Sequence, residues 1–395
     1  MKTRVLFISH MYPNDLDYSY GKVIHEQALS LIEYGYEVCV VCPIPYSLPF
    51  GKYLSINRRN ISKIPPKEIH NNIEVYYPRY ISFPKAIFFS QSGKLMYYGI
   101  FKNIKKIKET FNFDIIHAHF GMPDTYAANK LSKLFKKPLV STIQATDLDI
   151  TIGRSKSCKF KVSEALKSSA QVIAPTPRLQ AKLEEILEIK SEAIGYGIDP
   201  EKVLIEKSPE IAQKYKNKII ILSVSRIIKS KGLEYNIYAI KKLKEKYNNI
   251  KYLIVGDGPE RENLEILVKN LNLEEVVEFL GELPSSETIN YIAISHIFSL
   301  PSWQETFGLV YVEAMINEKV VIGCEGQGFD GIIIDGLNGF LAKPKDTNSI
   351  FEIIEFVIEN PSVSEKIGLN AKKTVLDNFT FATIAKKIDS IYRKL

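Results

Sequence analysis

Two basic residues five positions apart follow a strongly apolar segment in the second half of the chain. Arg226 and Lys231 come after the run KIIILSVS (218–225), just before a helix that we expect to open at Gly232. A guanidinium fork and a mobile ammonium beside a helix N-terminus can clamp a diphosphate, with about 1.5–3 kcal/mol from each charge-assisted hydrogen bond. The alternative is a pair of solvated basic residues in a lysine-rich chain, and the pair taken by itself favours that alternative.

Two carboxylates separated by seven residues form the most informative pattern, in LPSWQETFGLVYVEAM (300–315). The spacing places Glu305 in a loop and Glu313 on the helix that follows. One carboxylate could then accept hydrogen bonds from sugar hydroxyls while the other binds a ribose. The alternative is a first-turn glutamate favoured by the helix dipole plus a surface glutamate, but this does not explain the whole string. The backbone amides at the expected helix start belong to Thr306, Phe307 and Gly308.

Two histidines in the first half share one face of a predicted strand, in IHAHFG (116–121). His119 lies nearer the carboxyl end of that strand than His117, and therefore nearer any ligand site at the sheet edge. Histidine is suited to such a site because its ring can donate or accept a proton near neutral pH. The alternative is a core histidine bonded to the backbone, which suits His117 better than His119.

Strand-like runs alternate with amphipathic helical stretches almost from end to end. These predicted strands and helices must position the basic, acidic and histidine residues described above. Nearly continuous apolar strands separated by helices predict parallel sheets buried on both faces. Two such series predict an α/β protein with two doubly wound, Rossmann-like domains. We place them at 1–200 and 201–379, with the helix-like tail 380–395 able to pack back on the first. Ligands of such sheets lie beyond the carboxyl ends of the strands, so the architecture indicates a cleft enzyme with two substrates.

Length and composition agree with this organisation. The 395 residues exceed what one core usually organises, and 45% hydrophobic with 25% charged residues excludes a disordered, collagen-like or coiled-coil protein. We find no run long enough for a membrane span and no signal peptide, so we expect a soluble, cytoplasmic protein. Cys39 and Cys42 lie inside a strand-like run and are interpreted as core residues, and the cysteine spacing offers no metal cluster.

Taken together, the motifs resemble those of the family-four retaining glycosyltransferases of the GT-B fold. The R…K pair, the GDGPER turn (256–261), the E-x7-E pattern and the NGFLA return (338–342) occur in the family's order and approximate spacing. The resemblance covers nearly the whole chain and is strongest in 218–345. In detail the chain looks most like members that build surface polysaccharides such as teichuronic acid.

The resemblance implies a role for each matching position of the donor half. Arg226 and Lys231 would clamp the diphosphate of a nucleotide sugar, which the resemblance implies is a UDP-sugar. Glu305 would hold the donor sugar with the amides of 306–308, and Glu313 would bind the ribose. In the first half, His119 would lie beside the reacting sugar carbon, and Gly21 and Asp147 would belong to the acceptor and cleft loops.

Several positions depart from the family pattern. Lys22 follows Gly21 where the family has a second small residue, Gln144 replaces a histidine, and Tyr196 replaces the usual asparagine. Acceptor contacts are therefore expected to be unusual. Asp147 and Asp149 imitate the metal-binding D-x-D of another glycosyltransferase fold, but we interpret this as coincidence because the basic pair neutralises the diphosphate. We expect neither a metal nor a cofactor, since the nucleotide sugar is a substrate.

The resemblance implies transfer with retention of anomeric configuration, the acceptor attacking on the face of the leaving group. Stabilising the charge of the departing diphosphate should lower the barrier most, and positioning of the acceptor hydroxyl should supply much of the remainder. Glu305 is not expected to act as a glycosidase nucleophile, because the sequence shows no second carboxyl for the 5–5.5 Å pair that retaining hydrolases use.

Positive charge is concentrated in one segment of the acceptor half. Residues 52–108 hold twelve Lys or Arg and two acidic residues, a net +10, which leaves −3 for the rest of a chain whose total is +7. The segment is also rich in aromatic residues. It could dock on an anionic membrane leaflet and reach a lipid-linked acceptor, or it could be a solvated basic face; the two interpretations have equal weight. No nucleic-acid-binding signature is present.

Two other functions compete with sugar transfer. A non-hydrolysing nucleotide-sugar epimerase uses a similar two-domain cleft, although the F-G-L helix start between the two glutamates favours transfer. A non-catalytic sugar-binding subunit would fit the changes at Gln144 and Tyr196, although the donor half is intact. The donor sugar, its base, the acceptor and the linkage depend on cleft geometry that spacing does not reveal.

Overall fold

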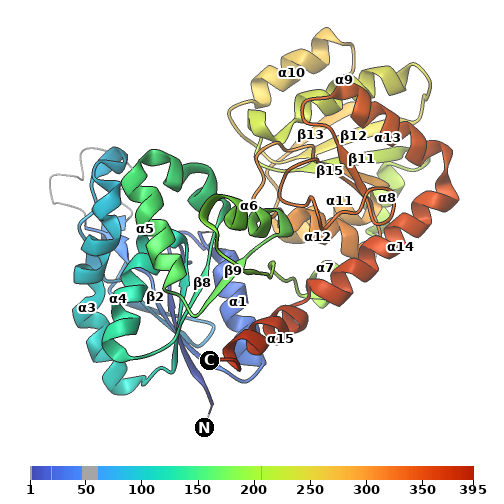
Figure 1. Ribbon diagram of the computed structural model, residues 1–395. Helices are drawn as coiled ribbons and strands as arrows, with labels where there is room; N and C mark the ends of the chain where they lie inside the picture. Colours follow the sequence, from blue (N-terminus) through green and yellow to red (C-terminus); the bar gives the residue numbers. More distant parts are fainter. Residues whose placement is uncertain (1, 19, 47–60, 206) are drawn as a thin grey trace. The chain divides into compact units, whose positions relative to one another are not determined.

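The computed structural model describes residues 2–18, 20–46, 61–205 and 207–395. The chain divides into two compact units (Figure 1). The first comprises residues 1–175, 179–196 and 384–395, and the second comprises 176–178 and 197–383. The C-terminal segment therefore belongs to the first unit, after the chain has completed the second.

The first unit is built on an eight-stranded sheet of order β10-β9-β8-β7-β1-β2-β5-β4. All neighbouring strands are parallel except β4 and β5, which form an antiparallel hairpin at one edge. A separate parallel ribbon joins β3 to β6. The bounds of these strands are β1 Arg4–Ile8, β2 Glu37–Val41, β3 Ile44–Pro45, β4 Lys67–His70, β5 Ile73–Tyr76, β6 Arg79–Tyr80, β7 Ile115–His119, β8 Leu139–Thr142, β9 Gln171–Ala174 and β10 Glu192–Ala193.

Helices cover both faces of this sheet. On one face the apolar stripe of α3, with Ile100 and Ile104, packs on strand residues that include Ile116 and Ala118 of β7. Side chains alternate along a strand, so His117 of β7 faces the other side, where its ring bonds Tyr392 of α15. The main helices of this unit are α1 Lys22–Glu33, α3 Ser92–Thr110, α4 Tyr126–Phe135, α5 Lys156–Lys167, α6 Pro177–Leu187 and α15 Phe381–Tyr392.

The second unit has a six-stranded sheet of order β13-β12-β11-β14-β15-β16, parallel throughout. Its strands are β11 Ile219–Val224, β12 Ile250–Val255, β13 Val277–Gly281, β14 Ile297–Ser299, β15 Val320–Cys324 and β16 Phe340–Ala342. Its helices are α7 Pro200–Val203, α8 Pro209–Lys214, α9 Leu233–Lys244, α10 Arg261–Asn270, α11 Ser285–Ile294, α12 Leu309–Ile316, α13 Thr347–Glu359 and α14 Pro361–Asn378.

The prediction of two doubly wound α/β sheets is confirmed. Among the parallel strands of each sheet the order reverses once, between β1 and β7 in the first unit and between β11 and β14 in the second. Loops leave the carboxyl ends of the strands in opposite directions at such a point and open a crevice for a ligand. The short strands β3, β4, β6 and β10 were not predicted from the sequence. None of the described helices is long and apolar enough to cross a membrane.

Candidate active site

At the reversal point of the second unit, the two loops with the strongest sequence signals meet. Lys231 comes from the β11–α9 loop and Glu305 from the β14–α12 loop, and Lys231 Nζ lies 2.7 Å from Glu305 Oε2. Both side chains are mostly buried, with 17% and 13% of their surface exposed. The structure thus joins the proposed diphosphate lysine to the proposed donor-sugar glutamate, a contact that sequence spacing could not reveal.

The backbone around Glu305 is shaped for close approach at the start of α12. Gly308 has φ +80°, and a Cβ there would lie 2.7 Å from the Tyr311 ring and 3.3 Å from the Glu305 carboxyl carbon. Only glycine fits this position without strain. The amide of Thr306 donates to Glu305 Oε1 at 3.2 Å, so each carboxylate oxygen already has one donor. Glu313 lies one helical turn inside α12, as predicted.

A pocket of about 660 Å³ lies at the carboxyl ends of β11, β12 and β13. Arg226 lines this pocket, and its exposed side chain makes no hydrogen bond or ion pair with the described residues. Lys231 and Glu305 are not among the lining residues. The two members of the basic pair therefore differ: Arg226 is open to a ligand, while Lys231 already neutralises a carboxylate. The pocket is lined by Val224, Ser225, Arg226, Val255, Gly256, Asp257, Gly258, Glu282, Leu283 and Thr288.

In the first unit, His119 ends β7 with none of its side chain exposed. Its ring stacks on His117 at a centroid distance of 4.6 Å, and neither ring nitrogen has a hydrogen-bond partner among the described residues. Burial, with a smaller effect of the neighbouring His117, holds the pKa of His119 well below 6.5. His119 is therefore a neutral ring with one unused donor and one unused acceptor. His117 instead bonds the Tyr392 hydroxyl at 2.6 Å and Thr142 Oγ1 at 2.7 Å, as a core histidine should.

Asp147 lies beneath the loop after β7 and is 1% exposed. Its Oδ2 accepts from the amides of Gly121 at 2.8 Å and Gln144 at 2.9 Å, and its Oδ1 accepts from the Met122 amide at 3.4 Å. Burial raises the pKa of Asp147 to about 6, although these amides lower it. The carboxylate thus ties two loops together within the first unit.

The two departures from the family pattern contact each other. Gln144 Nε2 donates to the Tyr196 hydroxyl at 2.5 Å, and both residues are buried. The amide nitrogen gives the buried hydroxyl a hydrogen-bond partner. A buried hydroxyl without a partner would lower the free energy of unfolding. The sequence showed two separate substitutions, whereas the structure shows one bonded pair.

Gly21 caps the N-terminus of α1 with φ +76°. A Cβ at this position would lie 2.6 Å from the carbonyl carbon of Met11, so the opening loop packs directly on the helix start. The next residue, Lys22, extends into solvent and lies 3.5 Å from Glu26. Close backbone approach is therefore preserved at Gly21 alone.

Sequence reasoning missed a histidine–aspartate pair at the reversal point of the first unit. His10 follows β1, and Asp124 lies in the helical turn η4 (Gly121–Thr125) that follows β7. His10 Nδ1 lies 2.5 Å from Asp124 Oδ2, and the His10 amide donates to Asp124 Oδ1 at 2.6 Å. The signal was available, because β1 and β7 are neighbours and both residues follow the carboxyl ends of these strands.

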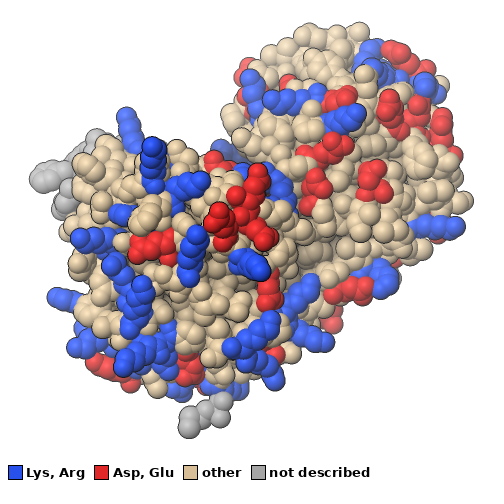
Figure 2. Space-filling view, in the orientation of Figure 1, with Lys and Arg blue, Asp and Glu red and all other residues tan. Residues whose placement is uncertain are grey.

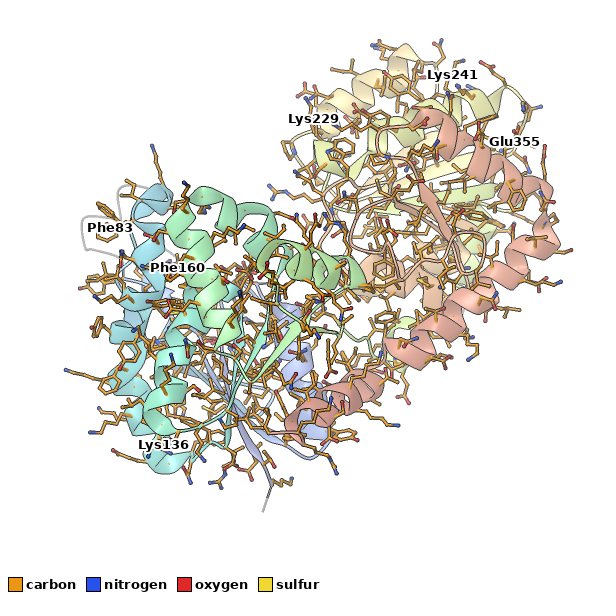
Figure 3. The ribbon with its side chains drawn as sticks, in the orientation of Figure 1. Phe83, Lys136, Phe160, Lys229, Lys241 and Glu355 are labelled. Carbon is orange, nitrogen blue, oxygen red and sulfur yellow. The ribbon has the colours of Figure 1, made fainter. Side chains whose placement is uncertain are left out.

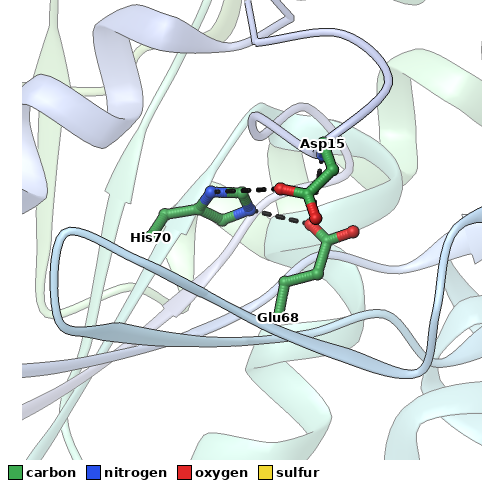
Figure 4. Close-up of side chains that lie close together, drawn as sticks. All are labelled: Asp15, Glu68 and His70. Carbon is green, nitrogen blue, oxygen red and sulfur yellow. Dashed lines mark hydrogen bonds and ion pairs between the residues drawn. The ribbon is translucent and has the colours of Figure 1, made fainter.

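A second polar cluster lies at the edge of the first sheet (Figure 4). His70 lies between Glu68, 2.8 Å from its Oε2, and Asp15, 3.9 Å from its Oδ1. Three such groups could ligate a metal, but Glu68 Oε2 already accepts from the Tyr77 hydroxyl at 2.9 Å and the Asp15 amide at 3.3 Å. These bonds fasten the opening loop to the β4–β5 hairpin.

Two family models match most of the chain. Residues 21–202 match the model described as Glycosyltransferase Family 4, and residues 205–374 match the model described as Glycosyl transferases group 1. The two matches follow one another along the chain, with residues 203 and 204 between them.

Curated relatives align over almost the full length. An uncharacterized glycosyltransferase of Methanocaldococcus jannaschii is 28% identical over 94% of both chains. TuaC of Bacillus subtilis, named provisionally as a teichuronic acid biosynthesis glycosyltransferase, is 24% identical over 99% of this chain and 98% of its own. The alpha-monoglucosyldiacylglycerol synthase of Acholeplasma laidlawii is 23% identical over 91% of this chain and 89% of its own.

Solved structures show the same fold. Sucrose-phosphate synthase of Thermosynechococcus elongatus has a TM-score of 0.77 at 18% identity, covering 100% of this chain and 99% of its own. HepE of Anabaena, solved in complex with UDP, has a TM-score of 0.74 at 20% identity, covering both chains completely. The predicted GT-B fold is therefore confirmed, and this chain is a glycosyltransferase of the family 4 and group 1 type, related to polysaccharide and glycolipid synthases.

Proposed function

We propose that this glycosyltransferase moves a sugar from a nucleotide-diphosphate sugar, UDP-linked, to a glycan or lipid-linked acceptor with retention of configuration. The reaction would serve the synthesis of a cell-surface polysaccharide or glycolipid. The observation that carries the proposal is the Lys231–Glu305 ion pair at the reversal point of the second sheet, in the same unit as the pocket that Arg226 lines. The choice of UDP is supported by HepE, whose structures hold UDP and UDP-glucose.

The ion pair suits capture of a diphosphate. A lysine ammonium has three donors, and Glu305 occupies one of them. A diphosphate could take the remaining donors while Arg226 contributes its planar fork from the pocket side. Glu305, with the amides of Thr306, Phe307 and Gly308 beside it, would then hold hydroxyls of the donor sugar, and Glu313 would hold the ribose.

The same arrangement supports departure of the nucleotide. Negative charge grows on the diphosphate as the glycosidic bond breaks, and fixed cations in a mostly buried site stabilise it without rearranging. Glu305 is a poor candidate for a covalent nucleophile because an ammonium lies 2.7 Å from its Oε2. Attack by the acceptor on the face of the leaving group, beside His119, is the mechanism we propose for retention.

One assay separates this proposal from its rivals. The protein is incubated with a panel of nucleotide sugars, with and without a membrane lipid extract as the source of acceptor. Transfer predicts release of nucleoside diphosphate that depends on the extract, and an α-linked product from an α-linked donor. An epimerised nucleotide sugar would establish the epimerase instead, and binding without turnover of any pair would establish a non-catalytic subunit.

A peripheral membrane contact at the cytoplasmic face is the second part of the proposal, and it rests on the surface around α3. Lys and Arg side chains spread over the face of the first unit that carries α3, α4 and α5 (Figure 2). Apolar side chains are exposed in the same region, Phe88 at 67% and Phe160 at 68%; Phe83 and Phe160 are labelled on this side of the unit in Figure 3. Residues 52–60 of the basic segment lie outside the described residues.

The backbone before α3 supports a functional role for these apolar side chains. Lys85, Ala86 and Phe88 all have φ between 54° and 57°, which is costly for residues other than glycine. A strained turn that exposes aromatic side chains between lysines fits the headgroup region of an anionic bilayer. We expect the protein to sediment with anionic vesicles and not with zwitterionic vesicles. Equal recovery with both would show that this surface is a solvated basic face.

A further inference from the structure

The first turns of α9 carry a polar side chain where the helix pattern favours an apolar one. Asn236 belongs to the buried stripe of this helix, together with Leu233, Ile237 and Ile240, and none of its surface is exposed. An amide side chain taken out of water costs free energy unless its polar atoms find partners. A polar break in a buried stripe is expected where a residue does more than fill the core.

Asn236 contacts three neighbouring strands of the second sheet. Its Nδ2 lies 3.2 Å from the carbonyl oxygen of Ser299 in β14, 3.0 Å from the Tyr252 hydroxyl of β12 and 3.2 Å from Ser223 Oγ of β11. Its Oδ1 accepts from Ser299 Oγ at 2.8 Å. The Tyr252 hydroxyl and Ser223 Oγ are themselves 2.8 Å apart, and all four residues are wholly buried. The polar atoms of the four side chains therefore form one connected network.

This network lies at the reversal point of the sheet. β11 and β14 are neighbours there, and the loops that carry Lys231 and Glu305 follow these two strands. Asn236 comes five residues after Lys231, and Ser299 comes six residues before Glu305. The two hydrogen bonds between Asn236 and Ser299 thus fasten α9 to β14 close to both members of the ion pair.

Contacts between the two loops continue from the network to the ion pair. The Ser230 carbonyl accepts from the Trp303 amide at 2.9 Å. Gly232 has φ +74°, and a Cβ there would lie 2.5 Å from the carbonyl oxygen of Pro301. The residues on both sides of Lys231 are therefore packed against the other loop. Because such packing leaves little free space, a shift of α9 relative to β14 would alter the ion pair as well.

We propose that Asn236 is a positioning residue for the donor site. By holding α9 to β14, it keeps the Lys231 ammonium in contact with the Glu305 carboxylate and in place for the diphosphate. A cation fixed in this way stabilises developing charge without having to rearrange. Asn236 is wholly buried and acts only through the ion pair. Its effect on the donor rests on the proposed function, whereas its effect on the ion pair needs no ligand.

Two variants loosen the network to different degrees. Asn236→Ala removes the amide and all its bonds, and Ser299→Ala removes only the bond from Ser299 Oγ to Asn236 Oδ1. The matched control is Asn338→Ala, because Asn338 is another buried asparagine of the second unit, bonded to the Ile332 carbonyl and to Thr374 Oγ1 of α14. All three variants should lower the free energy of unfolding, so stability alone does not distinguish them.

Calorimetric titration with UDP measures the effect on the donor site. Asn236→Ala should weaken UDP binding about five-fold, and Ser299→Ala should cause a smaller loss in the same direction. Asn338→Ala should bind UDP as wild type does. In the Lys231→Ala background, Asn236→Ala should change UDP affinity by less than about two-fold, because the cation through which Asn236 acts is gone. An asparagine with a merely structural role would not show this dependence on Lys231.

A second measurement needs no UDP. A double-mutant cycle with Lys231→Ala and Glu305→Ala gives the coupling of the ion pair in the free energy of unfolding. When the cycle is repeated with Asn236→Ala, this coupling should fall by about half or more, whereas Asn338→Ala should leave it unchanged. If wild type does not bind UDP while the coupling falls as expected, the proposed donor is wrong and the positioning of the ion pair stands.

Two results would overturn the inference. In the first, Asn236→Ala and Ser299→Ala lower the free energy of unfolding but leave UDP affinity and the coupling at their wild-type values. In the second, Asn236→Ala weakens UDP binding equally with and without Lys231, so that its effect does not pass through the ion pair. If Asn236→Ala does not fold, Ser299→Ala decides by the same two measurements.

Discussion

The two units carry their chemistry at equivalent places in their sheets but hold it in opposite ways. In the second unit, Arg226 is exposed and Lys231 shares its charge with Glu305 across two loops. In the first unit, Asp124 and Asp147 are buried and their oxygens are occupied by amides or by His10. One site leaves cations available for a charged ligand, and the other uses carboxylates to fix loops and a ring. In the proposed reaction, the second unit would therefore recognise the donor by charge, and the first unit would recognise the acceptor by shape.

The largest expected effect lies in the second unit. Lys231→Ala removes a cation from the proposed diphosphate site and leaves Glu305 mostly buried without its partner. We expect kcat to fall by about 10²–10³-fold, the effect of deleting one preorganised donor. The matched control is Lys229→Ala, because Lys229 lies in the same turn, is exposed and is labelled in Figure 3. Equal losses in both variants, measured by release of nucleoside diphosphate, would mean that general positive charge and not the ion pair matters.

The next effect concerns the stability of the first unit, where burial shifts the pKa values of carboxylates and imidazoles from their ordinary values. Asp147→Ala leaves the amides of Gly121 and Gln144 without an acceptor. We expect the free energy of unfolding to fall by about 2–3 kcal/mol. Asp149→Ala, which removes only an exposed pair with Lys182, should cost less than about 1 kcal/mol. Urea unfolding followed by circular dichroism measures the free energy of unfolding of both variants. Similar losses in the two would contradict the proposal that Asp147 holds two loops together.

Acidification should also affect the first unit more than the second. Burial lowers the pKa of His117 to about 3 and that of His119 well below 6.5. Below pH 6.5 the unfolded chain therefore binds more protons at these rings, and the free energy of unfolding falls as pH falls. Asp147, with its pKa raised to about 6, opposes this trend, and so do His10 and Asp124, whose pKa values are also raised.

The net change from pH 7 to pH 5 should be a loss in the free energy of unfolding, because two rings of the first unit are buried in their neutral form. The single tryptophan, Trp303, lies in the second unit and reports on it alone, whereas far-ultraviolet circular dichroism reports on both. The dichroism transition should move to lower urea on acidification while the fluorescence transition moves little. If the urea midpoint of the fluorescence transition shifts as much as that of the dichroism transition, acidification does not affect the first unit more than the second.

A smaller effect is expected at the Gln144–Tyr196 pair. Changing both to the family residues, Gln144→His and Tyr196→Asn, removes a bond that exists only when both present residues are in place. A double-mutant cycle on the free energy of unfolding should give a coupling of about 0.5–1.5 kcal/mol. Additive effects would show that the two substitutions are independent.

The smallest effect is expected on the exposed surface before α3. Phe88→Ser removes one aromatic ring from the proposed membrane contact and should weaken partitioning onto anionic vesicles about five-fold, the equivalent of about 1 kcal/mol. Phe356→Ser is the control, because Phe356 is an exposed ring on α13 of the second unit, 41% exposed against 67% for Phe88. Equal partitioning of the two variants would argue against this surface as the contact.

Strand patterns predicted both sheets well, because long apolar runs such as 219–224 have few alternatives to a buried parallel strand. The positions of Glu305 and Glu313 on loop and helix were predicted by Gly308, whose backbone only glycine adopts easily. The edge strands escaped because two-residue ladders such as β3 and β10 carry no periodicity.

The contacts of the site were less predictable than its elements. Lys231 and Glu305 are 74 positions apart, and His10 and Asp124 are 114 apart. Spacing alone places neither pair, since each depends on strand order, which the sequence does not state. Asp147 was predicted from its motif, yet its burial and its amide partners follow from how the loop after β7 folds back.

Calorimetric titration with UDP tests the central claim most directly, because it needs neither the acceptor nor turnover. The account predicts that wild type binds UDP, that Lys231→Ala and Arg226→Ala each weaken binding by about ten-fold or more, and that Lys229→Ala binds as wild type does. If Lys231→Ala and Arg226→Ala bind UDP as tightly as Lys229→Ala, the diphosphate is not held by these residues, and the account is wrong.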